Sequence, residues 1–147
     1  MTSLYASLDR MRPQFLSILR IVVALLFIQH GTTKFFGFPA AGPASLPPLI
    51  IVQGLLEIVG GVLLLVGAYS RIIAFILSGD MAVAYFMSHF PKSFFPMANG
   101  GNLAVLYSFV FLYIFFAGGG PWSVDEALLK REQRPEVAPD QLRRSGA

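Results

Sequence analysis

Two acidic side chains stand inside apolar stretches of this sequence, where charge is rarely found. Glu57 lies in a run over about 49–68, and Asp80 lies in the next run, over about 72–90. A carboxylate within a membrane-spanning helix costs roughly 2.5–3.5 kcal/mol on insertion scales, so such residues are rare and usually face a polar interior. The two acids therefore predict a buried polar site between helices.

The two acids are expected at similar depth in the membrane. Both lie about ten to thirteen residues from the polar break Tyr69-Ser70-Arg71, roughly 15–20 Å at ~1.5 Å rise per residue. Two carboxylates that lie close together can share one proton, because like charges oppose the ionisation of both. A histidine beside them would complete a proton relay.

Further polar side chains fall at matching levels of the other apolar runs. His30 and Lys34 are one helical turn apart, as are Gln53 and Glu57. Together these side chains predict a polar pocket that narrows inward from the outer face of the membrane. The candidate residues for ligand binding or a proton relay are His30, Lys34, Gln53, Glu57, Asp80, His89, Asn99 and Asn102.

Each candidate also has a structural interpretation. Glu57 or Asp80 could form a buried ion pair with Arg20 or Lys34 that only holds the helices together. Lysine and arginine near span ends can also extend toward the membrane surface. His89, at the end of a span, is typical of an interfacial residue. Asn99 suits a helix N-cap and Asn102 an interhelical hydrogen bond.

Composition excludes several other kinds of chemistry. The 147 residues include no cysteine, which removes disulfides, thiol catalysis and cysteine-ligated metal or iron–sulfur sites. No phosphate-binding loop, nucleophile triad or metal motif is found, so no catalytic residue and no metal ligand is predicted. The net charge of +3 comes from basic residues beside the apolar runs, which does not indicate nucleic-acid binding. Any redox role would need a bound cofactor or a partner protein.

The elements that would position these residues are four apolar runs. Hydrophobic residues make up 55% of the chain and charged residues only 13%, where roughly 25% is usual. Continuous runs near ~20 residues are typical of transmembrane helices. The predicted segments are a cytoplasmic lead over 1–13, spans over about 14–36, 49–68, 72–90 and 102–117 within a 14–118 domain, an interfacial helix within 119–133, and a disordered tail over 134–147.

The fold class expected is an all-α membrane protein, a four-helix transmembrane bundle of up-down topology. Most lysines and arginines, among them Arg10, Arg12 and Arg71, fall on one side of the spans, while Lys34 and Lys92 fall on the other. By the positive-inside rule, both termini are then cytoplasmic. The expected location is the inner membrane of a bacterium, with the lipid bilayer as first partner and a homo-oligomer or a redox partner protein as further candidates.

Four stretches resemble the DoxX family of small four-helix bacterial membrane proteins. They are RIVVALLFIQHGTTKFFG (20–37), QGLLEIVGGVLLLVGAYSR (53–71), GDMAVAYFMSHFPKSFFPMANGG (79–101) and PWSVD (121–125). The resemblance covers about residues 14–125. The polar pattern of the family falls on His30, Lys34, Glu57, Arg71, Asp80, His89, Asn99 and Asn102.

The resemblance implies the fold more directly than the activity. The family takes its name from a subunit of a thiosulfate:quinone oxidoreductase, and other members are associated with membrane redox and oxidative-stress systems. It implies an accessory or quinone-binding membrane component of such a system, at most a subunit of a quinone-linked oxidoreductase. Thiosulfate oxidation itself does not transfer by fold. A small proton-coupled transporter and a structural scaffold subunit are the alternatives.

Overall fold

Helices supply all the regular structure of residues 2–133, the part of the chain that the computed structural model describes. The all-α prediction is confirmed for this part, which has no strand. The predicted tail over 134–147 lies outside the described residues. In order, the elements are α1 (Thr2–Phe36), α2 (Pro48–Leu55), the π-helix η1 (Leu56–Gly60), α3 (Gly61–Val66), α4 (Ser70–Ala84), the π-helix η2 (Tyr85–His89), the 3₁₀-helix η3 (Phe90–Lys92), α5 (Pro96–Asn99), α6 (Asn102–Ala117) and α7 (Val124–Glu132).

Three helical segments are long and apolar enough to cross a membrane. They are Ser3–Phe36, Pro48–Val66 and Ser70–Lys92. The fourth apolar helix, α6, has 16 residues. At ~1.5 Å per residue it is about 24 Å long, which is less than the ~30 Å hydrocarbon core of a bilayer. Three of the four predicted spans thus correspond to helices able to cross a membrane, and a fourth crossing by α6 stays a prediction.

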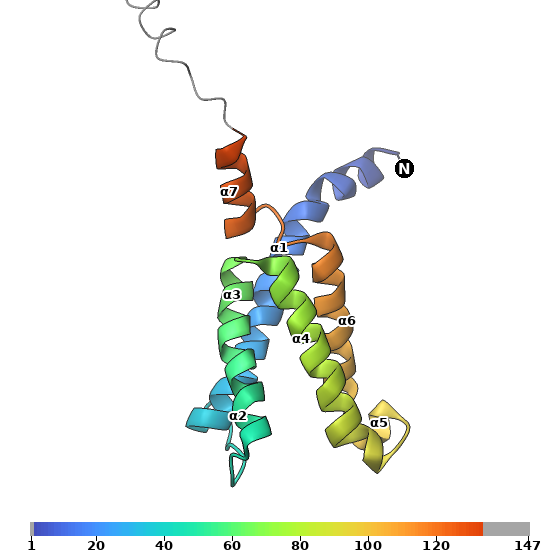
Figure 1. Ribbon diagram of the computed structural model, residues 1–147. Coiled ribbons are helices and arrows are strands. Elements are labelled where there is room, and N and C mark those ends of the chain that lie inside the picture. Colours follow the sequence, from blue (N-terminus) through green and yellow to red (C-terminus); the bar gives the residue numbers. More distant parts are fainter. Residues whose placement is uncertain (1, 134–147) are drawn as a thin grey trace, which may run out of the picture.

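The bundle is built from two helix pairs. One column, formed by α2, η1 and α3, packs against α1, while α4 packs along the length of α6 (Figure 1). Phe27, Leu64, Leu77, Phe111 and Ile114 are fully buried where the pairs meet. The N-terminal part of α1 and helix α7 lie at one end of the bundle, and α5 lies at the other (Figure 1).

The first helix is longer than the predicted span over 14–36. It begins at Thr2 and runs through Pro13, and its N-terminal part leans away from the bundle (Figure 1). Proline removes one backbone hydrogen bond from a helix and favours a bend there. Leu4, Leu8 and Met11 share one face at 3.6-residue spacing and are all exposed.

The turn between α3 and α4 lies two residues earlier than the predicted break over 69–71. Gly67 ends α3 in the left-handed region, with φ of 73°. The amide of Ala68 donates to the carbonyl of Leu63 (2.9 Å) and that of Gly67 to Leu64 (3.2 Å), the pattern of a Schellman motif. The positive φ therefore makes Gly67 the residue that ends the helix, and α4 already begins at Ser70.

Small residues allow close contacts between helices at two interfaces of the bundle. A Cβ atom at Gly31 of α1 would lie 2.5 Å from Cγ1 of Ile58 and 2.9 Å from the carbonyl oxygen of Gly54. Between α4 and α6, the Ser78 hydroxyl donates to the Ser108 carbonyl (2.8 Å), and the Ser108 hydroxyl donates back to Ser78 (3.0 Å). Small residues at both interfaces let the backbones approach, as is usual between membrane helices.

Replacing Gly31 by alanine should therefore destabilise the bundle. A methyl group there meets the Gly54 carbonyl, which cannot move aside without shifting α2, and overpacking of this kind costs about 1–3 kcal/mol. Gly79→Ala is the matched control, because a Cβ at Gly79 has nothing within 4 Å. Thermal unfolding in detergent should show a lower Tm for Gly31→Ala and an unchanged or higher Tm for Gly79→Ala. Equal Tm values for the two variants would contradict the packing described here.

Candidate functional site

A cavity of about 310 Å³ lies within the bundle, toward the end that carries α5. Its walls come from α1, α2, η1, α4, η2 and α6. Five of the eight residues predicted from the sequence line it together. The lining residues are His30, Lys34, Gln53, Glu57, Met81, Ala84, Ser88, His89, Gly100, Leu103, Ala104 and Tyr107.

An ion pair between α1 and η1 forms the charged part of this wall. Nζ of Lys34 lies 2.5 Å from Oε1 of Glu57, and the two side chains are only 17% and 3% exposed. Lys34 therefore does not extend to the membrane surface, and of the two basic partners considered for the acids it is the one that pairs. Removing either charge from a buried pair leaves the other uncompensated, so the two hold α1 against η1.

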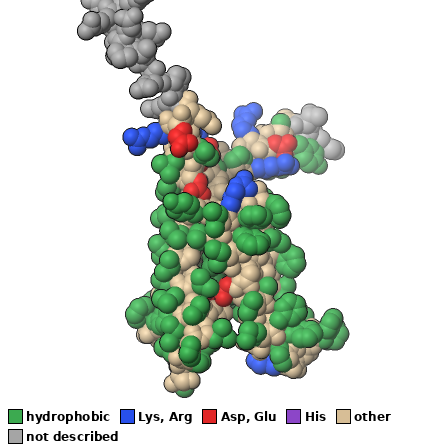
Figure 2. Space-filling view, viewed as in Figure 1, with side chains coloured by type: hydrophobic (Ala, Val, Ile, Leu, Met, Phe, Trp, Pro, Cys, Tyr) green, Lys and Arg blue, Asp and Glu red, His purple; other side chains and the backbone are tan. Residues whose placement is uncertain are grey.

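Lys34 does not provide hydrogen-bond partners for all the carboxylate oxygens of the two acids. Oε2 of Glu57 and Oδ2 of Asp80 are buried and have no hydrogen-bond partner among residues 2–133. Asp80 does not line the cavity, but it lies within electrostatic range of both Lys34 and Glu57. Figure 2 shows an acidic patch in the groove between the α2–α3 column and α4, on a surface that is otherwise largely hydrophobic.

Two π-helical turns set the directions of the cavity side chains. Glu57 lies in η1, and Ser88 and His89 lie in η2. A π-helical turn inserts one extra residue into a helix, which rotates the following side chains relative to α-helical spacing, and such turns are frequent at functional sites. By α-helical spacing, His89 is expected nearly opposite Asp80; in the structure it faces the cavity.

The two predicted asparagines do not line the cavity. Asn99 is buried and organises the loop before α6, because its Nδ2 donates to the Ser93 carbonyl (2.8 Å) and its Oδ1 accepts from the Gly101 amide (2.7 Å). It is not the N-cap of α6, since that position belongs to Gly101. Asn102 is exposed, and its amide contacts the sulfur of Met97 at 3.6 Å.

The histidines occupy different positions in the wall. Nδ1 of His89 lies 3.1 Å from the carbonyl oxygen of Asn99, so Asn99 orients the ring that lines the cavity. His30 is exposed at the surface of α1 and packs edge-on against Tyr107, with ring centroids 5.7 Å apart. Tyr107 lines the cavity but is not among the residues predicted from the sequence. Its phenol in an otherwise apolar run was the available signal, but only the packing of α6 against α1 brings it to His30.

Arg20, at the other end of the bundle, is a structural residue. Its side chain is fully buried and makes no ion pair among the described residues, contrary to the expected pairing with an acid. The guanidinium donates to the carbonyls of Leu64, Leu65 (2.5 Å), Gly119 (2.8 Å) and Trp122 (2.8 Å). The first two carbonyls belong to the last turn of α3, where a cation also suits the helix dipole.

Two more charged residues bind backbone groups at the same end of the bundle. The Asp125 carboxylate accepts from the amides of Tyr69 and Ser70 (2.7 Å each) at the start of α4. Arg71 donates to the carbonyls of Phe115 (2.8 Å) and Phe116 (2.6 Å) near the end of α6. We call Arg20, Arg71 and Asp125 the clasp. Asp125 also lies in the first turn of α7, which is capped by Ser123 because the Ser123 hydroxyl accepts from the Glu126 amide.

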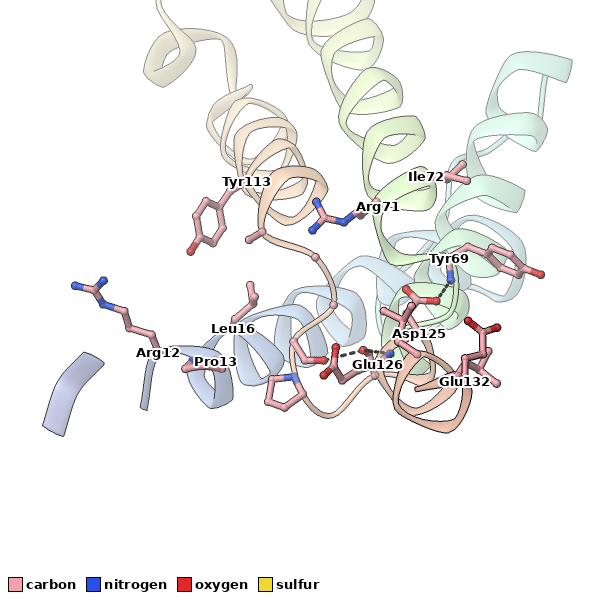
Figure 3. A pocket seen from close by; sticks show the side chains of 18 residues that line it. Arg12, Pro13, Leu16, Tyr69, Arg71, Ile72, Tyr113, Asp125, Glu126 and Glu132 are labelled. Carbon is pink, nitrogen blue, oxygen red and sulfur yellow. Dashed lines mark hydrogen bonds between the residues drawn. The ribbon is translucent and has the colours of Figure 1, made fainter. Parts of the chain in front are cut away.

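A larger cavity, of about 780 Å³, lies beside the clasp between α1, α4, α6 and α7 (Figure 3). Four of its five charged side chains have partners, and the fifth, Glu132, is exposed. Asp125 and Arg71 bind backbone groups, Arg12 pairs with Asp9 (2.8 Å), and Glu126 pairs with Lys130 (3.4 Å). The smaller cavity is the better candidate for a ligand site, because buried acceptors near it lack partners.

Comparison with known proteins gives the relatives of the chain. The family model described as DoxX matches residues 15–90. An uncharacterized protein of Haemophilus influenzae is 48% identical over 132 residues, covering 85% of this chain and 98% of that protein. An uncharacterized membrane protein of Mycobacterium tuberculosis is 29% identical over 139 residues, covering 81% of this chain and 84% of its own length. No solved structure matches.

Replacing Arg20 by lysine should weaken the whole fold. Lysine keeps the charge but cannot present the planar fork that reaches four carbonyls, and lost hydrogen bonds to a charged group suggest a destabilisation of about 2–4 kcal/mol. Arg12→Lys, at an exposed ion pair, is the control and should change little. Thermal unfolding in detergent and the yield of folded protein from membranes would measure both. An unchanged Tm for Arg20→Lys would refute a structural role for this arginine.

Proposed function

We propose that this chain, which belongs to the DoxX family of membrane proteins, binds a quinone-type ligand in the cavity between α1, η1, α4 and α6. It would act there as an accessory membrane component of a redox or oxidative-stress system. The observation that carries the proposal is one cavity of about 310 Å³ with both apolar and polar walls and a buried ion pair.

The walls suit a flat ring with oxygen atoms at opposite edges. Met81, Leu103 and the Tyr107 ring supply apolar contact, while Lys34 and Gln53 can donate hydrogen bonds to a carbonyl oxygen. A volume of about 310 Å³ is at the lower end of the ~300–1,000 Å³ range of small-molecule sites. It would hold a head group and leave an isoprenoid tail outside. His30, exposed on α1, marks where such a tail could leave the bundle toward lipid.

The proposed topology has four crossings, with α6 as the fourth and both termini in the cytoplasm of a bacterium. It is supported by the positions of α7 and of the N-terminal part of α1 at the same end of the bundle (Figure 1). Arg10, Arg12, Arg71 and Lys130 belong to that end, as the positive-inside rule requires of the cytoplasmic side. The cavity then lies in the periplasmic half of the inner membrane.

Single cysteines can test this topology, because the chain has none of its own. Ser45→Cys, in the loop between α1 and α2, should react with a membrane-impermeant maleimide on intact spheroplasts. Ser3→Cys, near the start of α1, should react only after the membrane is permeabilised. The reverse pattern, or labelling of both from outside, would overturn the proposed orientation.

A bound quinone should be detectable chemically. Protein purified in mild detergent should yield an isoprenoid quinone on solvent extraction, and added quinone should raise the Tm. Tyr107→Phe should lower the amount retained about fivefold, the effect of one lost hydrogen bond of ~1 kcal/mol. Tyr113→Phe, on the same helix but lining the other cavity, should retain the wild-type amount.

Two results would end this proposal. One is a quinone-free extract together with a Tm that added quinone does not change. The other is an equal loss of quinone in both tyrosine variants, which would indicate binding by the general lipid-facing surface. Transport and scaffolding would then be the functions to test. If quinone binding holds, electrons would come from or go to a partner protein or a bound cofactor, because the chain has no cysteine for thiol redox chemistry.

A further inference from the structure

We propose that this site is built for the reduced form of its ligand, a hydroquinone, in preference to the oxidised quinone. The inference rests on the proposed function and adds the redox form to it. A quinone carbonyl can only accept hydrogen bonds, whereas a hydroquinone hydroxyl both donates and accepts. The unpartnered groups at the site therefore decide which form it matches better.

His89 lines the cavity, and its ring offers one nitrogen as an acceptor. Its Nδ1 lies 3.1 Å from the carbonyl oxygen of Asn99, and a carbonyl can only accept, so Nδ1 carries the hydrogen. In the neutral ring, Nε2 then holds a lone pair and no hydrogen. Asn99 is itself fixed by Ser93 and Gly101, so this tautomer is built into the loop before α6.

Glu57 supplies a second acceptor. The residue lines the cavity and is 2% exposed. Its Oε1 accepts from Lys34, while Oε2 has no partner among residues 2–133. Oδ2 of Asp80, which lies within electrostatic range of Glu57, is likewise buried without a partner among residues 2–133. Leaving a buried acceptor unpaired is costly, and most of all for a charged group. A ligand hydroxyl that donates to Glu57 would remove that cost, and a quinone carbonyl would not.

Donors on the wall complete the match. Lys34 has hydrogens beyond the one that it gives to Glu57, and Tyr107 and Gln53 can also donate. A hydroquinone hydroxyl can accept from these donors while it donates to His89 or Glu57. An oxidised quinone makes only the first kind of contact and leaves a carboxylate oxygen and a ring nitrogen unpaired. Sites that hydrogen-bond a hydroxyl discriminate strongly against analogues that lack it.

The test compares the oxidised and reduced forms of two short-tailed quinones. A benzoquinone and a naphthoquinone with short isoprenoid tails, oxidised or kept reduced under argon, would be titrated into the full-length protein in nanodiscs. The reduced form should bind about tenfold more tightly, because it gains a hydrogen bond to a charged acceptor that the oxidised form cannot make. Apparent Kd from calorimetry and the Tm shift give two independent readouts.

Two variants assign the preference to named atoms. Glu57→Gln removes the charged acceptor. His89→Asn keeps an N–H for the Asn99 carbonyl but removes the Nε2 lone pair, so it preserves the loop if Glu57→Gln fails to fold. Each should reduce the preference for the reduced form, while Glu126→Gln, in α7 at the other end, should keep it.

The outcomes separate the two proposals. Equal affinity for both forms, or tighter binding of the quinone, overturns the redox preference and leaves quinone binding in place. A preference that survives both Glu57→Gln and His89→Asn overturns the assignment to these acceptors. If neither form binds at all, the proposed function fails, and this inference fails with it.

Discussion

The buried guanidinium of Arg20 is the interaction on which the rest of the fold depends. A charged group inside a bundle is tolerated only when its hydrogen-bonding capacity is met. Arg20 meets it with backbone carbonyls, two from the last turn of α3 and two from the segment after α6. These bonds join α1, α3 and the C-terminal segment at one point. Arg71 and Asp125 extend the same principle to α6 and α4, so charged side chains at this end serve as helix caps.

The two ends of the bundle differ in how completely their buried charged groups are paired, although the Ser70 hydroxyl at the clasp end is also buried without a partner among residues 2–133. At the clasp, both arginines and the aspartate bind backbone groups that would otherwise be left open by helix ends. At the cavity, Lys34 pairs with one carboxylate oxygen of Glu57, and the other oxygen has no partner among residues 2–133. One buried oxygen of Asp80 likewise has no partner there. A membrane protein that can satisfy buried charge so fully at one end has no need, for stability alone, to leave it unsatisfied at the other. This contrast is the physical reason for placing function at the cavity.

Sequence reasoning located the helices and much of the cavity, for identifiable reasons. Continuous apolar runs predicted the long helices, and helical spacing placed His30 with Lys34 and Gln53 with Glu57. The π-helical turns at Glu57 and His89 carry no local pattern, so the direction of His89 could not be deduced. Asn99 was expected to cap a helix because asparagine commonly does so. Its actual bonds to Ser93 and Gly101 depend on a loop geometry that spacing does not encode. Tyr107 belongs to the site only through tertiary packing.

The partners of Arg20 also order events during synthesis. Gly119 and Trp122 follow Arg20 by 99 and 102 residues, so nearly the whole described chain must be made before the guanidinium can bind them. Until then, α1 holds an arginine that lacks two of its four acceptors. A chain truncated before residue 119 would keep its three longest apolar helices and still lack the acceptors that complete this bonding. Such a chain would leave the buried guanidinium with two of its four acceptors, so the C-terminal segment completes the bonding of a residue in the first helix.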